Sequence, residues 1–75
     1  MLIIFERSTM PLQGLEPQTS IELEEGTIIR ELLRRYADAE QVPYILPVVN
    51  GEVRRLDYVL RNGDRFRLFW LSAGG

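Results

Sequence analysis

The residues with the clearest chemical potential in this 75-residue sequence are its last two, Gly74 and Gly75. Glycine has no Cβ and wide backbone freedom, so a Gly-Gly end can thread a narrow channel and present its carboxylate to the catalytic groups of another protein. We expect Gly75 to be the reacting position. We also expect Gly74, Ala73 and Ser72 to form the segment that enters the partner's active site. The dipeptide alone is equally compatible with an ordinary frayed chain end.

The segment before this tail, residues 65–71, is the strongest strand signal in the chain. Successive side chains of a strand point to opposite faces of its sheet. One predicted face carries Phe66, Leu68 and Trp70, and the other carries Arg65, Arg67, Phe69 and Leu71.

If the first face fills the core, hydrophobic side chains on the second face point outward close to the tail. Exposed aromatic surface often marks a partner site, and structural packing is the alternative explanation. We predict a partner-docking surface made of Phe69, Leu71, Val48 and Arg67. Arg67 either pairs with acidic residues of a partner or belongs to a solvated strand face. Trp70 is expected to cover the edge of the core.

The remaining elements must hold this strand in place. Apolar runs and alternation predict two early strands, over residues 2–5 and 19–24, joined by a connection over residues 8–17 that contains Pro and Gly. Thr27 is expected to cap a helix over residues 28–39, where apolar residues recur at helical spacing. Asn50-Gly51 predicts a tight turn between a strand that begins at residue 48 and a short strand over residues 52–54. Asn62-Gly63-Asp64 predicts a second turn.

This order of elements predicts an α+β fold. A single helix must cover one face of a mixed sheet of about four to five strands. A crossover through the helix lets the first and last strands pair as parallel central neighbours, while the hairpins add antiparallel strands. We expect one domain over residues 1–75, in which residues 72–75 form a flexible C-terminal tail.

Composition narrows the classes of function. The sequence has no Cys and no His, and all nine basic residues are Arg, so Lys is also absent. These absences remove thiol and lysine nucleophiles, an imidazole base, disulfides and Cys/His metal sites. Catalysis by carboxylates alone stays open, although it needs a cleft that a domain of this size rarely encloses. A net charge of −2 gives no sign of a basic surface that would bind nucleic acid. The apolar start of the chain reaches Glu6 and Arg7 too soon to be a signal peptide or a membrane span. We therefore expect a cytoplasmic protein that is not an enzyme and binds no metal, nucleic acid or membrane.

Three sequence blocks resemble those of a known family. The blocks are Val48-Val49-Asn50-Gly51-Glu52, Leu60-Arg61-Asn62-Gly63-Asp64 and Ala73-Gly74-Gly75. Together with the order of elements, they resemble the MoaD/ThiS family of sulfur carrier proteins over essentially the whole chain. The resemblance implies a ubiquitin-like β-grasp fold and chemistry on Gly75. An E1-like adenylating enzyme would use ATP and magnesium to activate the C-terminal carboxylate, and sulfur transfer would leave a thiocarboxylate.

In this family the carrier is a substrate of other enzymes rather than a catalyst. The resemblance therefore implies no stably bound cofactor and two kinds of partner. These are the adenylating enzyme and a sulfur-accepting synthase, such as the large subunit of molybdopterin synthase or thiazole synthase. The pathway stays open among molybdopterin or tungstopterin, thiamine, cysteine and tRNA thiolation. Two alternative functions also stay open: a ubiquitin-like modifier joined to lysines of target proteins, and a β-grasp module that only binds.

Overall fold

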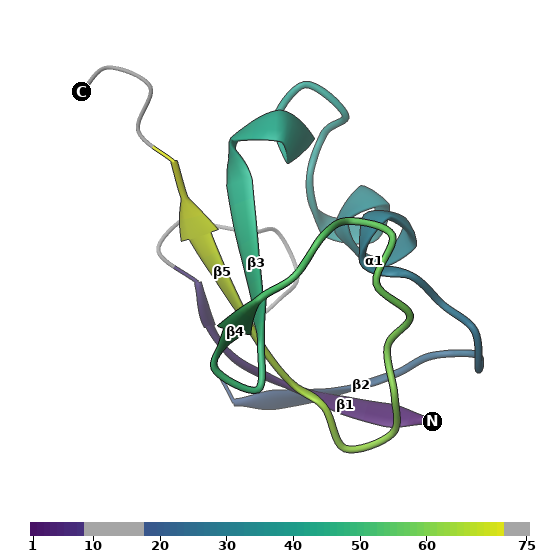
Figure 1. Cartoon of the computed structure of the whole chain (residues 1–75). Helices are drawn as coiled ribbons and strands as arrows, with labels where there is room; N and C mark the ends of the chain where they lie inside the picture. The colour runs from purple at the N-terminus through teal and green to yellow at the C-terminus, as the bar shows by residue number, and fades with distance from the viewer. Residues whose placement is uncertain (9–17, 72–75) are drawn as a thin grey trace.

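The computed structural model describes residues 1–8 and 18–71 (Figure 1). Most of the predicted connection, residues 9–17, and the predicted tail, residues 72–75, lie outside these ranges. The described elements follow the predicted order, with one short 3₁₀ helix added. They are β1 (Leu2–Ser8), β2 (Thr19–Glu22), α1 (Ile29–Tyr36), the 3₁₀ helix η1 (Val42–Tyr44), β3 (Ile45–Val49), β4 (Glu52–Val53) and β5 (Arg65–Trp70).

The five strands of the described ranges form one mixed sheet, in the order β2-β1-β5-β3-β4. β1 and β5 lie side by side and are parallel, with Phe5 opposite Phe66. β2 pairs with β1, β3 with β5 and β4 with β3, each antiparallel. The prediction of a mixed sheet whose first and last strands are parallel central neighbours is therefore confirmed.

β1 extends beyond the apolar run that predicted a strand over residues 2–5. After an irregularity between Phe5 and Arg7, Arg7 pairs with Arg67 and Ser8 pairs with Leu68. The neighbouring strand satisfies the backbone groups whatever the side chains are, so polarity at this end of β1 does not stop the strand. β2 is shorter than expected and ends at Glu22, just before the chain turns toward α1.

α1 covers one face of the sheet, and the core lies between the two (Figure 1). The buried hydrophobic residues of this core are Ile3, Phe5, Ile21, Leu23, Ile29, Leu32, Leu33, Ile45, Val49, Leu60, Phe66 and Leu68. α1 ends at Tyr36 rather than at residue 39, because Ala37 takes an extended backbone and the residues just after it offer no large apolar side chain to the core. No helix in the described ranges has the length and apolar character needed to cross a membrane.

The prediction that Thr27 caps the helix is wrong. The Thr27 hydroxyl donates to the Glu24 carbonyl at 2.6 Å, which closes the preceding turn instead. The first helical amides find their acceptors far along the chain: the Ile29 N–H donates to the Tyr58 carbonyl at 3.1 Å, and the Arg30 N–H donates to the Leu56 carbonyl at 2.9 Å. Backbone carbonyls of the connection between β4 and β5 therefore do the work of a cap.

β3 begins at Ile45 and contains Pro47, although the sequence predicted a strand only from residue 48. The Pro47 carbonyl accepts from the Arg54 N–H at 3.1 Å, on the side of the two-residue strand β4. The proline nitrogen faces the same side, so its missing N–H removes no bond to β5. Beyond β3, Asn50 (φ 53°) and Gly51 (φ 82°) both have positive φ, which confirms the predicted tight turn.

Candidate functional site

β5 separates a core face from an outer face, as the alternation predicts. Phe66 and Leu68 are buried, Arg65 and Arg67 are exposed, and Phe69 is half-buried on the outer face. Because α1 covers only the opposite face of the sheet, the outer face has no covering element among the described residues.

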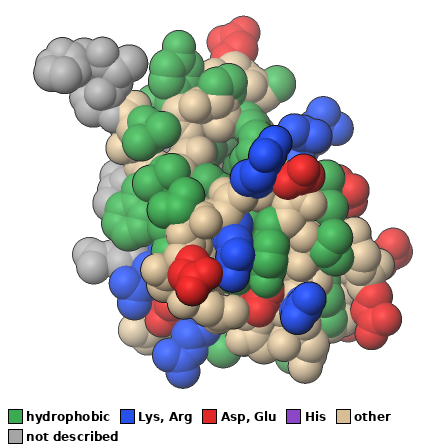
Figure 2. All heavy atoms as spheres, viewed as in Figure 1, with side chains coloured by type: hydrophobic (Ala, Val, Ile, Leu, Met, Phe, Trp, Pro, Cys, Tyr) green, Lys and Arg blue, Asp and Glu red, His purple; other side chains and the backbone are tan. Residues whose placement is uncertain are grey.

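Cross-strand pairing brings hydrophobic side chains together on this outer face. Phe69 lies opposite Leu46 of β3, and Arg67 lies opposite Val48. We call Leu46, Val48 and Phe69 the outer-face cluster. Figure 2 shows hydrophobic side chains gathered over β3 and β5. The structure thus places three of the predicted docking residues, Phe69, Val48 and Arg67, on one surface, while their docking role stays a prediction.

Leu46 was missed by sequence reasoning. Pro43 and Pro47 flank it in the sequence, and two such prolines indicate only an extended or turn conformation for the residues between them. The alternation of Ile45, Pro47 and Val49 toward the core identifies Leu46 as an outer-face residue, once Pro47 is accepted inside a strand.

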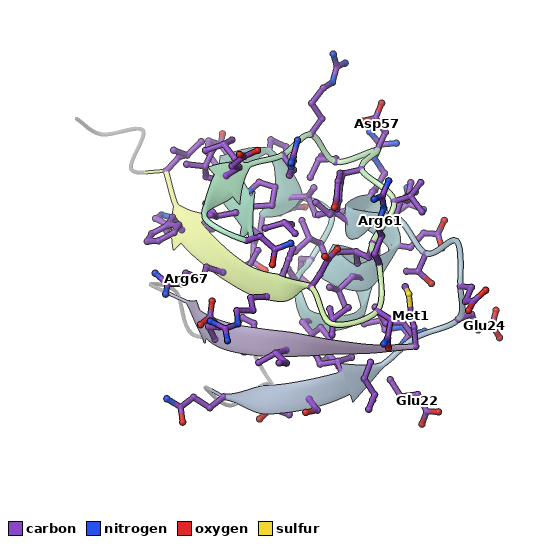
Figure 3. The ribbon with its side chains drawn as sticks, turned by 60° about the horizontal axis from the view of Figure 1, so that its bottom comes forward. Met1, Glu22, Glu24, Asp57, Arg61 and Arg67 are labelled. Atoms are coloured by element: carbon purple, nitrogen blue, oxygen red, sulfur yellow. The ribbon has the colours of Figure 1, made fainter. Side chains whose placement is uncertain are left out.

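A charged pair borders the outer-face cluster. The Arg67 guanidinium lies 3.2 Å from the Glu6 carboxylate, which belongs to β1. Arg65, on the same face of β5, has no ion pair among the described residues. Figure 3 shows Arg67 well away from Arg61 and Met1, which lie on another part of the surface. Along β5 the outer face therefore carries Arg65 and Arg67 first, with the exposed Ile4 of β1 opposite Arg65, and Phe69 toward the end of the strand.

The end of β5 is fixed by contacts with η1. The N–H of Leu71, the last described residue, donates to the Tyr44 carbonyl at 2.7 Å. The rings of Tyr44 and Trp70 lie with their centroids 5.9 Å apart, and both side chains are more than two-fifths exposed. Trp70 therefore packs on Tyr44 and lies opposite the buried Ile45 of β3, while its role as a cover for the edge of the core stays a prediction. Leu71 is 45% exposed, and strand alternation puts its side chain on the same side as Phe69.

The predicted reacting segment follows directly on this anchored end. Ser72, Ala73, Gly74 and Gly75 lie outside the described residues, so their role stays a prediction.

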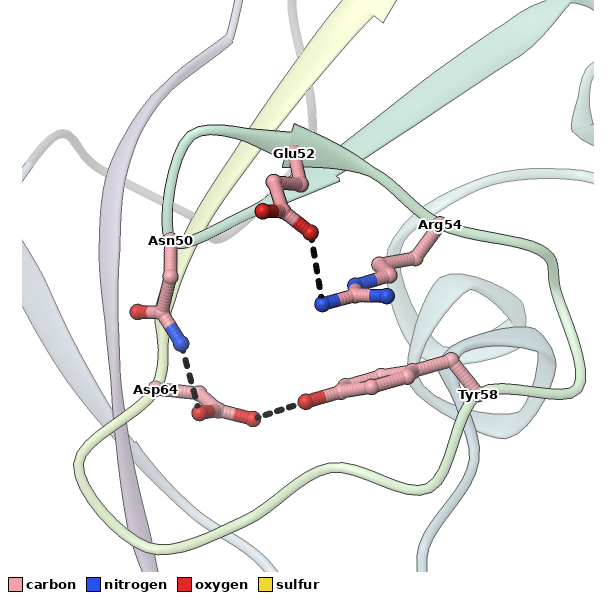
Figure 4. A network of polar contacts seen from close by, with 5 residues as sticks. All are labelled: Asn50, Glu52, Arg54, Tyr58 and Asp64. Carbon is pink, nitrogen blue, oxygen red and sulfur yellow. Dashed lines mark hydrogen bonds and ion pairs between the residues drawn. The ribbon is translucent and has the colours of Figure 1, made fainter.

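The two turn motifs meet at a buried carboxylate. Asp64 is 6% exposed and accepts three hydrogen bonds. Two come from the Asn50 amide at 3.0 Å and the Tyr58 hydroxyl at 3.3 Å (Figure 4), and the third comes from the Arg61 N–H at 2.8 Å. The Asn50 side-chain oxygen accepts from the Arg65 N–H at 3.0 Å. This network joins the β3–β4 turn to the first residue of β5, and so helps to set where β5 begins.

No group of three or more His, Cys, Asp or Glu side chains in residues 1–8 and 18–71 is arranged to hold a metal ion.

No protein-family model matches the chain, and no curated protein sequence matches it. Among solved structures, it is similar to a chain in the protein–protein complex of subunits 1 and 2 of the molybdopterin-converting factor from Helicobacter pylori 26695. The similarity covers 100% of both chains with a TM-score of 0.62, at 20% sequence identity, and shows the fold. The chain therefore has the predicted ubiquitin-like β-grasp fold, a small mixed sheet with one helix on one face.

Proposed function

We propose that this chain is a sulfur carrier that works with a synthase subunit in molybdopterin assembly. The observation that carries the proposal is the match in fold, over the full length of both chains, to a chain in a complex of molybdopterin-converting factor subunits. The Gly74-Gly75 end supports it. The contact between the two turn motifs, through Asn50 and Asp64, supports it as well.

In the proposed reaction, a carboxylate oxygen of Gly75 attacks the α-phosphorus of ATP and displaces pyrophosphate, which leaves an acyl-adenylate. A hydrosulfide ion then attacks the acyl carbon. The C–O bond to AMP breaks, AMP leaves with its electron pair, and loss of the sulfhydryl proton leaves Gly75 as a thiocarboxylate. Magnesium and ATP belong to the adenylating enzyme in this scheme.

The part of the chain in this chemistry is to bring its C-terminal carboxylate to the active site of the partner. Leu71 is held to Tyr44 by a backbone hydrogen bond, so four residues separate the anchored body from the chain's last carbonyl carbon. Four extended residues span at most about 14 Å. The body must therefore dock close to the mouth of the partner's active site, and the outer-face cluster beside Leu71 is the surface that we propose for this docking.

The test is a reconstitution with the adenylating enzyme of the same organism, magnesium, ATP and a sulfide source, followed by intact-mass measurement. Exchange of one oxygen for sulfur adds about 16 Da, and we expect this gain on the full chain. The matched control is a chain that lacks Gly75, which should gain no sulfur because its end no longer reaches the reacting position.

A full chain that folds, forms no acyl-adenylate and gains no sulfur with its cognate enzyme would contradict the proposal. Adenylation followed by a ladder of covalent conjugates on target lysines, without a thiocarboxylate, would establish the modifier function instead.

A further inference from the structure

A second surface lies on the helix side of the molecule, away from the outer-face cluster. We call it the helix-side hollow, a depression of about 260 Å³ between α1, η1 and the connection between β4 and β5. Figure 1 shows these three segments on the same side of the sheet. The hollow is lined by Arg30, Arg34, Ala39, Val42, Pro43 and Leu56.

The geometry of the hollow is fixed by the backbone. The Arg30 N–H donates to the Leu56 carbonyl at 2.9 Å, which ties the connection to the first turn of α1. Val42 and Leu56 pack against the core with part of their surfaces and remain partly exposed. The backbone bond therefore holds the residues that line the hollow in place, and the aliphatic side chains of Val42 and Leu56 form its base.

Two arginines on one face of α1 form the rim. Arg30 and Arg34 are four residues apart, so their side chains neighbour each other and repel. Arg30 lies in the first turn of α1, where the helix dipole disfavours a positive charge, whereas Arg34 lies in the last turn, where the dipole favours one. Both side chains are exposed, and neither forms an ion pair among the described residues.

Three other arginines have compensating neighbours, whereas Arg35, Arg61 and Arg65, like Arg30 and Arg34, form no ion pair among the described residues. Arg54 lies 2.8 Å from Glu52 and 5.1 Å from the centre of the Tyr58 ring (Figure 4). Arg55 pairs with Asp57, and Arg67 pairs with Glu6. Arg30 and Arg34 are two unpaired arginines that lie together on the rim of one aliphatic hollow.

We propose that the helix-side hollow binds an extended segment of a partner protein, in which an aliphatic residue is flanked by Asp or Glu. The aliphatic side chain would cover Val42 and Leu56, and the carboxylates would pair with Arg30 and Arg34. The net charge of −2 and a rim of only two arginines favour an acidic peptide over nucleic acid. This site goes beyond the proposed function. It lies across the sheet from the outer-face cluster, so the two surfaces can be occupied together.

The test is a titration of the ¹⁵N-labelled full chain with a short peptide of alternating Glu and Leu, blocked at both ends, followed by amide NMR. We expect saturable shifts at Arg30, Arg34, Val42 and Leu56, and none at Val48. Arg30→Gln and Arg34→Gln should each weaken the peptide's affinity about threefold. Retained dispersion of the spectrum shows that each variant is folded.

Arg35→Gln is the matched control, because Arg35 is exposed on the same helix and does not line the hollow. It removes the same charge and should leave the affinity unchanged. A peptide of alternating Gln and Leu should bind more weakly than the acidic one. The proposal is overturned if the acidic peptide gives no saturable shifts at the hollow or if Arg35→Gln weakens binding as much as Arg30→Gln. Equal shifts with inorganic phosphate alone would also overturn it.

Discussion

The side-chain amide of Asn50 donates to the carboxylate of Asp64 at 3.0 Å, and this bond joins two turns that lie 14 residues apart in the chain. Asn50 follows β3 directly, and Asp64 immediately precedes β5. The same Asn50 side chain accepts from the Arg65 N–H. The start of the strand that leads to the proposed reacting end is therefore held by side chains as well as by the sheet.

Asp64→Asn should destabilise the fold by about 1–3 kcal/mol, out of roughly 4–11 kcal/mol expected for a domain of this size. An amide at this position turns one acceptor into a donor, and that donor faces the donors from Asn50 or Arg61 in a site that is only 6% exposed. Urea unfolding followed by circular dichroism measures the loss.

Asp57→Asn is the control for charge, because the Asp57 side chain is 67% exposed and makes only a long contact of 3.8 Å with Arg55. This variant should change the free energy of unfolding by less than about 0.5 kcal/mol. Equal losses in the two variants would show that the buried hydrogen bonds of Asp64 do not matter for stability.

Gly51→Ala should cost about 1 kcal/mol of stability through the backbone alone. Gly51 has a φ of 82°, and an added Cβ would meet no atom within 4 Å. A side chain with a Cβ disfavours this conformation, and Asn tolerates it better than Ala does. Gly51→Asn should therefore lose less than Gly51→Ala in urea unfolding. If the two variants are equally unstable, conformational preference is not the cause.

Most of the fold follows from local patterns. The alternation in β5, the turn residues Asn50 and Gly51, and the helical spacing around Leu32 and Leu33 each specify their own conformation. The groups that cap the helix start could not be predicted in this way. The acceptors for its first amides are carbonyls at Tyr58 and Leu56, and no local pattern links these positions to α1.

The candidate site, like the fold, follows from local patterns only in part. Strand alternation is enough to place Phe69 on the outer face. The neighbours of Phe69 depend on the register between β3 and β5, which puts Leu46 opposite it. The pairing of Arg67 with Glu6 depends on the parallel contact of β1 with β5 and on the irregularity after Phe5. A single sequence contains no direct sign of either register.

Tyr44→Leu should lower stability by about 0.5–1.5 kcal/mol, because it keeps apolar volume but removes the ring that packs on Trp70. Trp70 is the only tryptophan in the chain, so its fluorescence reports this site alone. We expect its emission to shift in Tyr44→Leu and to stay unchanged in Tyr44→Phe, which keeps the ring. An unchanged spectrum and stability in Tyr44→Leu would contradict a role for the ring pair at the end of β5.

Phe69→Ser should weaken binding to the synthase subunit about tenfold or more, since aromatic residues near the centre of an interface carry much of its binding energy. Leu71→Ser tests the same surface with less risk to the fold, because Leu71 is 45% exposed and lies just beyond β5. Val59→Ser is the matched control: Val59 is 49% exposed, but it pairs with Ile28 on the helix side rather than joining the outer face. Calorimetric titration of each folded variant with the subunit measures the affinity. If Val59→Ser weakens binding while Phe69→Ser and Leu71→Ser do not, the partner docks on the helix side and the outer-face cluster is not the docking surface.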